Sequence, residues 1–201
     1  VDDKAEEVWG FDVARFGSDD SALARRRGPV LTRKVETRHG LDIMQSVGWI
    51  KNEYDAAHPK PRSIYVDEIG MGAGVVDRGR ELGLPIIGIN VSEASALNAD
   101  KYVNQRAELW FRGKEFLERK HCNLANDEAL GAELLIPQYS FQSNGKIKVE
   151  GKADIKKRGY ASPNRADAFL LTLAEEATIA AGKAEYRNWS KPIRRIIKGI
   201  V

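Results

Sequence analysis

Three aspartates stand at positions where a carboxylate is costly unless a cation meets it. Asp12 lies in the apolar stretch 9–13, Asp67 ends the apolar run 64–66, and Asp167 falls in the first turns of a predicted helix. Burial of an ionised carboxylate is unfavourable without a charged or hydrogen-bonding partner. Carboxylate oxygens are also the hard ligands that Mg²⁺ and Mn²⁺ prefer. We therefore hypothesise that these three acids converge on divalent metal ions, which in pairs promote phosphodiester hydrolysis.

Each acid also has a purely structural interpretation. Asp12 could form a salt bridge with Arg15 or another base, and Asp67 could cap the turn that follows it. Asp167 could complement the dipole of its helix, because acids are favoured near helix N-termini. Of the three, Asp12 has the fewest structural explanations, since a mid-strand position offers no turn or helix end to cap.

Composition predicts one globular domain with a basic tail. The chain has 201 residues, of which 42% are hydrophobic, and a net charge of only +3, but the bases cluster at 25–27, 146–158 and beyond 183. We expect a domain at 1–182 and a tail at 183–201 that holds DNA, docks on a partner or makes no contact. Cys122 is alone, which excludes an internal disulfide and favours a reducing cytosol. No apolar run is long enough for a membrane span, so we expect no membrane partner.

The order of predicted elements in the first half indicates an α/β fold. Alternation and turn residues predict strands at 9–13, 22–27 and 30–37, which form an antiparallel meander. Helical periodicity and caps then predict the alternating series helix 42–54, strand 63–67, helix 75–82 and strand 86–91. This order predicts a mixed sheet with right-handed crossovers, flanked by helices.

The second half is predicted to add helices and a β-hairpin. We expect helices at 104–119 and 127–135, a hairpin at 139–142 and 146–150, and a basic loop at 152–160. The final helix is predicted to begin with Ser162 as N-cap and Pro163 at its first position. Asp167 lies at the margin of the apolar stripe of this helix and is therefore expected to face the sheet.

Four segments, in order, resemble the nuclease domain of the terminase large subunit of tailed bacteriophages. They are Gly10–Ser21, Val66–Asp77, Tyr102–Trp110 and Arg158–Ala168, within a resemblance that spans most of residues 8–175. The resemblance implies an RNase H-like fold, which agrees with the element order. It also implies a metal-dependent DNA endonuclease that cuts concatemeric viral DNA during capsid filling.

Carried over by position, the resemblance assigns roles to the acids. It implies that Asp12 bridges two Mg²⁺ or Mn²⁺ ions and that Asp67 and Asp167 each complete the ligands of one ion. Asp19 matches a further acidic position and is a candidate auxiliary ligand. Hydrolysis would leave a 3′-hydroxyl and a 5′-phosphate. Many relatives have an acid at the position of Asn164, so a second carboxylate on this helix is not implied here.

Basic residues near the predicted site are candidates for contacts with DNA phosphates. Such contacts fix the duplex without reading its sequence. The candidates are Arg15, Lys146, Lys148, Lys152, Lys156, Lys157 and Arg158. Arg106 and Glu108 belong to one of the resembling segments, where a role in the site and a salt bridge within the helix remain equal alternatives.

The resemblance also implies partners. They are double-stranded DNA, a separate N-terminal ATPase domain, the small terminase subunit and the portal protein, all in the host cytoplasm. The start at Val1 fits a missing upstream domain. The glycines of 70–74 and of 145–152 depart from dinucleotide- and ATP-binding motifs, so no ATPase activity is expected in this chain.

Two alternatives to this function stay open. A junction resolvase or transposase-type nuclease with an RNase H-like fold would share the acids but would lack the segments around Arg106 and Ser162. A DNA-binding or portal-docking module would keep the fold without cleaving DNA.

Overall fold

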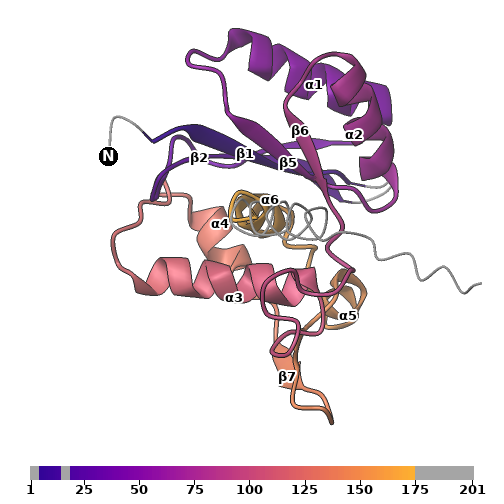
Figure 1. Cartoon of the computed structure of the whole chain (residues 1–201), viewed down its shortest axis with the longest axis vertical. Coiled ribbons are helices and arrows are strands. Elements are labelled where there is room, and N and C mark those ends of the chain that lie inside the picture. The colour runs from indigo at the N-terminus through magenta and orange to yellow at the C-terminus, as the bar shows by residue number, and fades with distance from the viewer. Residues whose placement is uncertain (1–4, 15–18, 175–201) are drawn as a thin grey trace, which may run out of the picture.

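A six-stranded mixed sheet organises the described part of the chain, residues 5–14 and 19–174 of a computed structural model (Figure 1). The strand order is β3-β2-β1-β5-β6, with β4 paired to β2, and a two-stranded hairpin stands apart. The strands are β1 (Glu7–Asp12), β2 (Asp20–Arg27), β3 (Val30–Leu31), β4 (Glu36–His39), β5 (Ser63–Asp67), β6 (Ile86–Ile89), and the hairpin strands β7 (Tyr139–Phe141) and β8 (Ile147–Val149).

Helices cover both faces of the sheet, with α1 and α2 on one face and α6, α3 and α4 on the other (Figure 1). They are α1 (Ile43–Ala56), α2 (Met71–Glu81), α3 (Gln105–Glu118), α4 (Glu128–Glu133), α5 (Lys152–Lys157) and α6 (Asn164–Leu171). None of the helices in the described ranges is long and apolar enough to cross a membrane. The predicted α/β class, mixed sheet and added hairpin are confirmed.

Strand pairing brings two of the three acids to one edge of the sheet. β1 is antiparallel to β2 but parallel to β5, with Phe11 opposite Val66. The next residue of each strand, Asp12 or Asp67, is also its last. Because parallel neighbours end at the same edge, both carboxylates emerge there.

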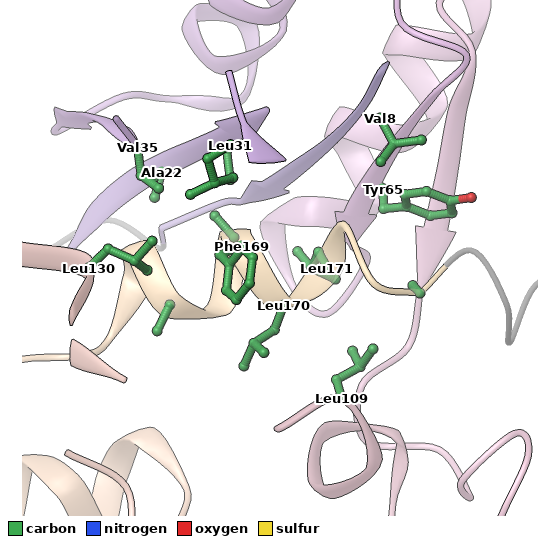
Figure 2. Packing of buried hydrophobic residues seen from close by; sticks show 14 residues of the cluster. Val8, Ala22, Leu31, Val35, Tyr65, Leu109, Leu130, Phe169, Leu170 and Leu171 are labelled. Atoms are coloured by element: carbon green, nitrogen blue, oxygen red, sulfur yellow. The ribbon is translucent and has the colours of Figure 1, made fainter. Parts of the chain in front are cut away.

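Side-chain alternation assigns the two acids to the face that α6 covers. Trp9 and Phe11 belong to the apolar cluster with α1 and α2, whereas Val8 belongs to the cluster with α6. Gly10 and Asp12 therefore share the α6 face of β1. Figure 2 shows Phe169, Leu170 and Leu171 of α6 lying between residues of the sheet and Leu109 of α3.

Three local expectations differ from the structure. The predicted strand 30–37 is divided into β3 and β4, because the backbone N–H of Val35 donates to Asp127 Oδ2 (2.8 Å) and the chain leaves the sheet there. The predicted basic loop after Gly151 contains the short helix α5, anchored by the fully buried Ile155. α6 begins after Pro163 as N-cap, not after Ser162.

The helix after β5 also begins earlier than predicted, at Met71, because its glycines are used for close packing. A Cβ atom on Gly72 would lie 1.7 Å from the carbonyl oxygen of Asp67. Gly70 before it has a φ of +69°, a conformation that favours glycine. The predicted glycine-rich loop is thus mostly the first turn of α2, which packs tightly against the end of β5.

α6 contacts β1 through the main chain. A Cβ atom on Gly10 would lie 2.0 Å from the carbonyl oxygen of Ala168 and 3.0 Å from the nitrogen of Thr172. Any side chain at position 10 would force α6 away from the sheet. This close approach brings the first turns of α6, with Asp167, against the end of β1.

Gly10→Ala is therefore expected to destabilise the fold strongly. Overpacking of a well-packed core costs about 1–3 kcal/mol, and a clash with backbone lies at the upper end of that range. Gly48→Ala in α1 is the matched control, because a Cβ there meets nothing within 4 Å. That variant should be neutral or up to about 1 kcal/mol more stable. Urea unfolding followed by circular dichroism measures both, and equal stabilities would contradict the close approach.

Candidate metal centre

The three predicted acids line one small cavity at the edge of the sheet. Its volume is about 20 Å³, close to that of a single water molecule. Asp12 comes from β1, Asp67 from β5 and Asp167 from α6, and Arg106 and Trp110 of α3 also line the cavity. Asp12 is 2% exposed and Asp167 8% exposed. The structure thus brings together all three acids that the sequence singles out.

An ammonium group lies between two of these carboxylates. Lys152 Nζ is 2.8 Å from Asp12 Oδ2 and 3.3 Å from Asp167 Oδ2, and it also donates to Asn164 Oδ1 at 3.2 Å. Lys152 is the first residue of α5, and Asn164 is the first residue of α6. A positive charge is therefore held where three oxygen atoms from different elements converge.

Arg106 holds the other oxygen of Asp167. Its Nη1 donates to Asp167 Oδ1 at 2.7 Å, and its guanidinium lies 5.7 Å from the centre of the Trp110 ring. Asp167 is thus fixed from two sides, by Arg106 at Oδ1 and by Lys152 at Oδ2. The alternatives for Arg106 were a role in the site and a salt bridge within its helix, and the structure places the side chain in the site. Glu108 instead pairs with Arg112 of the same helix at 3.3 Å and accepts from Ser95.

Burial and the repulsion of neighbouring carboxylates raise the pKa of Asp12 and of Asp67. Burial raises the pKa of Asp12 above its usual value, against the lowering effect of Lys152, and the charge of Asp167 raises it further. Burial, with the charges of Asp12 and Asp167, raises the pKa of Asp67 to about 6, although the N–H of Ile69 donates to its Oδ1 at 3.1 Å. Carboxylates with such pKa values in a cavity are typical of functional sites.

The neighbouring carboxylates favour the charged form of Lys152. Burial opposes the charged form of Lys152, but the charges of Asp12 and Asp167 raise its pKa above the usual lysine value. Lys152 therefore stays protonated across the physiological range and offsets part of the repulsion between the acids. Lys152 and Arg106 are thus the counter-ions of the three acids.

The donor set fits a divalent cation, although the side chains do not yet form a closed coordination shell. Within residues 5–14 and 19–174, no group of three or more His, Cys, Asp or Glu side chains is close enough to hold a metal ion. The position between Asp12 and Asp167 already attracts a cation, and hard carboxylate oxygens suit Mg²⁺ or Mn²⁺. A metal ion would bind there by displacing the ammonium of Lys152.

Asp19, the candidate auxiliary acid, lies outside this arrangement. It is not among the described residues that line the acid cavity, and its Oδ2 accepts from Lys156 Nζ at 2.8 Å. Burial opposes its ionisation, but the hydrogen bond and the charge of Lys156 lower its pKa. Asp19 is therefore an ionised acid that holds α5, and its role as a ligand stays a prediction.

The predicted DNA-binding residues occupy different environments. Lys152 lies among the acids, whereas Lys148 is exposed on the hairpin and Lys146 is half-buried beside it. Lys157 pairs with Asp154 at 2.8 Å, and Arg158 pairs with Glu150 at 2.5 Å. Arg15 lies outside the described residues, as does the predicted tail 183–201. Contact with DNA stays a prediction for all of them.

The fold has clear counterparts among solved structures, whereas sequence comparison finds none. No family model matches the sequence, and no curated protein matches it. The structure is similar to the nuclease domain of the large terminase subunit gp2 of bacterial virus Sf6, with 23% identity and a TM-score of 0.68 over 84% of this chain and 89% of that one.

Two further similar structures come from phages of thermophiles. The large terminase nuclease from thermophilic phage G20c with bound magnesium is 14% identical, with a TM-score of 0.64 over 85% of this chain and 81% of that one. The nuclease domain of Thermus phage P74-26 large terminase is 13% identical, with a TM-score of 0.62 over 85% of this chain and 80% of that one. Related crystal structures of these domains hold manganese, calcium or cobalt. The expected fold, that of terminase nuclease domains, is confirmed.

Asp67→Asn is expected to stabilise the metal-free protein above about pH 6. The raised pKa means that the fold binds a proton on Asp67 more tightly than the unfolded chain does, so stability falls as pH rises from 3.8 to about 6. An asparagine has no charge and so avoids this loss of stability, while its amide oxygen still accepts from the N–H of Ile69. A gain of about 1 kcal/mol would raise Tm by about 2–4 °C.

Thermal unfolding at pH 8 with a chelator measures this gain. Asp77→Asn, a substitution at an exposed acid of α2, is the control and should leave Tm unchanged. A Tm below that of the unsubstituted protein for Asp67→Asn would show that Asp67 stabilises the fold.

Proposed function

We propose that this chain is the nuclease domain of a terminase large subunit and that it cleaves double-stranded DNA with divalent metal ions. The observation that supports it best is the cluster of Asp12, Asp67 and Asp167 around one cavity, with an ammonium held between two of the carboxylates. The same fold in other phages is found with bound Mg²⁺, Mn²⁺ or Co²⁺. Fold and acid cluster therefore support the same chemistry.

The three carboxylates would hold two Mg²⁺ or Mn²⁺ ions. Asp12 is the proposed shared ligand, because it lies between Asp67 of the neighbouring strand and Asp167 of the covering helix. Bound divalent ions supply an activated water and neutralise charge at phosphorus and at the leaving oxygen. Arg106 holds Asp167 in place, and the displaced Lys152 ammonium would pair with a phosphate oxygen of the DNA.

The DNA backbone would be bound by the hairpin and α5. Lys148 lies opposite Ser140 and projects from the face of the hairpin away from Tyr139 and Val149. Lys156, Lys157 and Arg158 pair with acids at or near the surface, and such pairs contribute little to stability. Phosphates can therefore compete for these cations, as they do in contacts that position DNA without reading its sequence.

The biological setting proposed here follows from the terminase fold. The domain would cut concatemeric viral DNA when capsid filling starts and ends, in the host cytoplasm. It would act beside an ATPase domain that drives packaging, with the small terminase subunit and the portal protein as partners. DNA delivered by those partners would compensate for a weak affinity of the isolated domain.

Asp12→Asn is expected to abolish cleavage. Incubation of supercoiled plasmid with the protein and Mn²⁺ or Mg²⁺ should yield nicked and linear DNA. Loss of one group that stabilises charge in the transition state lowers the rate of cleavage by about 100-fold or more, so this variant should be nearly inactive. Asp77→Asn is the matched control, because Asp77 is an exposed acid of α2 outside the acid cluster.

Three outcomes of this assay are distinguishable. Full cleavage by Asp12→Asn would show that Asp12 is not a ligand. Plasmid binding without cleavage, at every concentration of either metal, would favour the alternative of a DNA-binding or docking module. Preferential cleavage of four-way junctions over duplex would favour the resolvase alternative.

Lys152→Met is expected to raise the affinity for Mn²⁺. The ammonium occupies the position between Asp12 and Asp167 and must leave before a metal ion binds. Methionine keeps the length of the side chain without its charge. We expect the Kd for Mn²⁺ to fall on the order of tenfold, which equals about 1.4 kcal/mol of binding free energy. Isothermal titration with Mn²⁺ measures it, with Lys157→Met as the control, and an unchanged affinity would contradict competition by Lys152.

A further inference from the structure

The N-terminal turn of α6 carries Asp167 of the acid cluster and Asn164, which contacts Lys152. Asn164 accepts from Lys152, and Asp167 binds both Lys152 and Arg106. The first N–H groups of a helix have no partner within the helix and need caps. Pro163 is the N-cap residue of α6, and the described chain shows no side-chain capping bond from it. The position of this turn therefore depends on groups from elsewhere in the fold.

Glu133, the last residue of α4, supplies the missing cap. Its Oε2 accepts from the backbone N–H of Ala166 at 3.0 Å. A negative charge at a helix N-terminus also interacts favourably with the helix dipole. Burial raises the pKa of Glu133 to about 7, while the N–H groups of Ala166 and Arg165 lower it. The carboxylate is thus half-buried against the first turn of α6.

α4 is itself fixed, so its last residue provides a rigid cap. Asp127 caps α4 by accepting from Leu130 N–H at 3.0 Å, and the same carboxylate accepts from Val35 N–H at 2.8 Å. Leu130 is fully buried in the cluster that contains Phe169 of α6.

Arg165 ties the first turn of α6 to the sheet side as well. It donates to Val35 O and, at 3.1 Å, to Thr37 Oγ1. Its Nε lies 3.8 Å from Glu133 Oε1. The turn is therefore held by α4, by Val35 before β4 and by Thr37 of β4.

We propose that Glu133 is a positioning residue that sets the affinity of the acid cluster for divalent metal ions. By capping Ala166 it fixes the adjacent Asp167, so that Asp167 Oδ2 faces Asp12. Without the cap the first turn of α6 would fray, and Asn164 and Asp167 would lose their places relative to β1. This inference rests on the proposed function only in taking the acids as metal ligands.

A comparison of Glu133→Ala with Glu133→Gln distinguishes the effect of the capping hydrogen bond from the effect of the negative charge. Alanine removes the acceptor, whereas the amide oxygen of glutamine still accepts from Ala166. We expect the Kd for Mn²⁺, measured by isothermal titration, to rise about tenfold in Glu133→Ala, the scale for loss of a residue that orients a metal ligand. Glu133→Gln should stay within about threefold of the unsubstituted protein. Glu128→Ala, an exposed acid of the same helix, is the control and should change nothing.

The capping bond is also testable without a variant. The charged groups that face Glu133 are Arg165 and Asp167. In ¹H–¹⁵N spectra, the amide of Ala166 should shift over the pH range in which Glu133 ionises, and the amide of Leu170 should not. A static Ala166 amide would overturn the cap, even if Glu133→Ala fails to fold.

The outcomes for the cap and for the function are distinguishable. Equal Mn²⁺ affinity in Glu133→Ala and the unsubstituted protein, with both folded, would overturn the positioning role even if DNA is cleaved. Tight Mn²⁺ binding that weakens in Glu133→Ala, in a protein that cleaves no DNA, would support the positioning role and contradict the nuclease.

Discussion

The close approach of α6 to β1 is the constraint on which the site depends. At Gly10 the backbone of the helix lies directly on the backbone of the strand, with no layer of side chains between them. Asp12 is the next residue of β1 on the same face as Gly10. Asp167 directly precedes Ala168, whose carbonyl contacts Gly10. The distance between these two acids is therefore set by a main-chain contact. The apolar clusters on the two faces of the sheet stabilise this contact, but the absence of a side chain at Gly10 sets its distance.

A second theme is the balance of charge around the acid cluster. Three carboxylates at one cavity repel one another, and two of them are hard to ionise because of burial. Lys152 and Arg106 reduce this repulsion from opposite sides of Asp167. Among the described residues, Nε and Nη2 of Arg106 have no hydrogen-bond partner although they are buried. A cluster of this kind is not the most stable packing of these elements, and such compromises between stability and activity are typical of functional sites.

The sequence predicts the sheet, the hairpin and the three acids, because each leaves a local signal. Asp12 interrupts an apolar alternation, and Asp67 ends an apolar strand before glycines. The counter-ions are not predictable in this way: Lys152 lies in a stretch that reads as a solvated basic loop, and its burial among acids depends on how α5 packs. Arg106 belongs to a segment singled out by resemblance, yet its partner Asp167 is 61 residues away. Glu133 leaves no signal at all, because its partner is a backbone N–H on another helix. Local patterns predict elements, whereas these contacts depend on tertiary packing.

The separation of the acids along the chain has a consequence for folding. Asp12 and Asp67 are 55 residues apart (67 − 12), and Asp67 and Asp167 are 100 residues apart (167 − 67). Contacts between such distant segments form only after long loops are closed, which makes them slow relative to local structure. The strands that carry Asp12 and Asp67 can pair during synthesis before α6 leaves the ribosome. The acid cluster is therefore completed by α6, the last helix of the described residues. Metal ions that bind only the completed cluster would stabilise the native state by mass action.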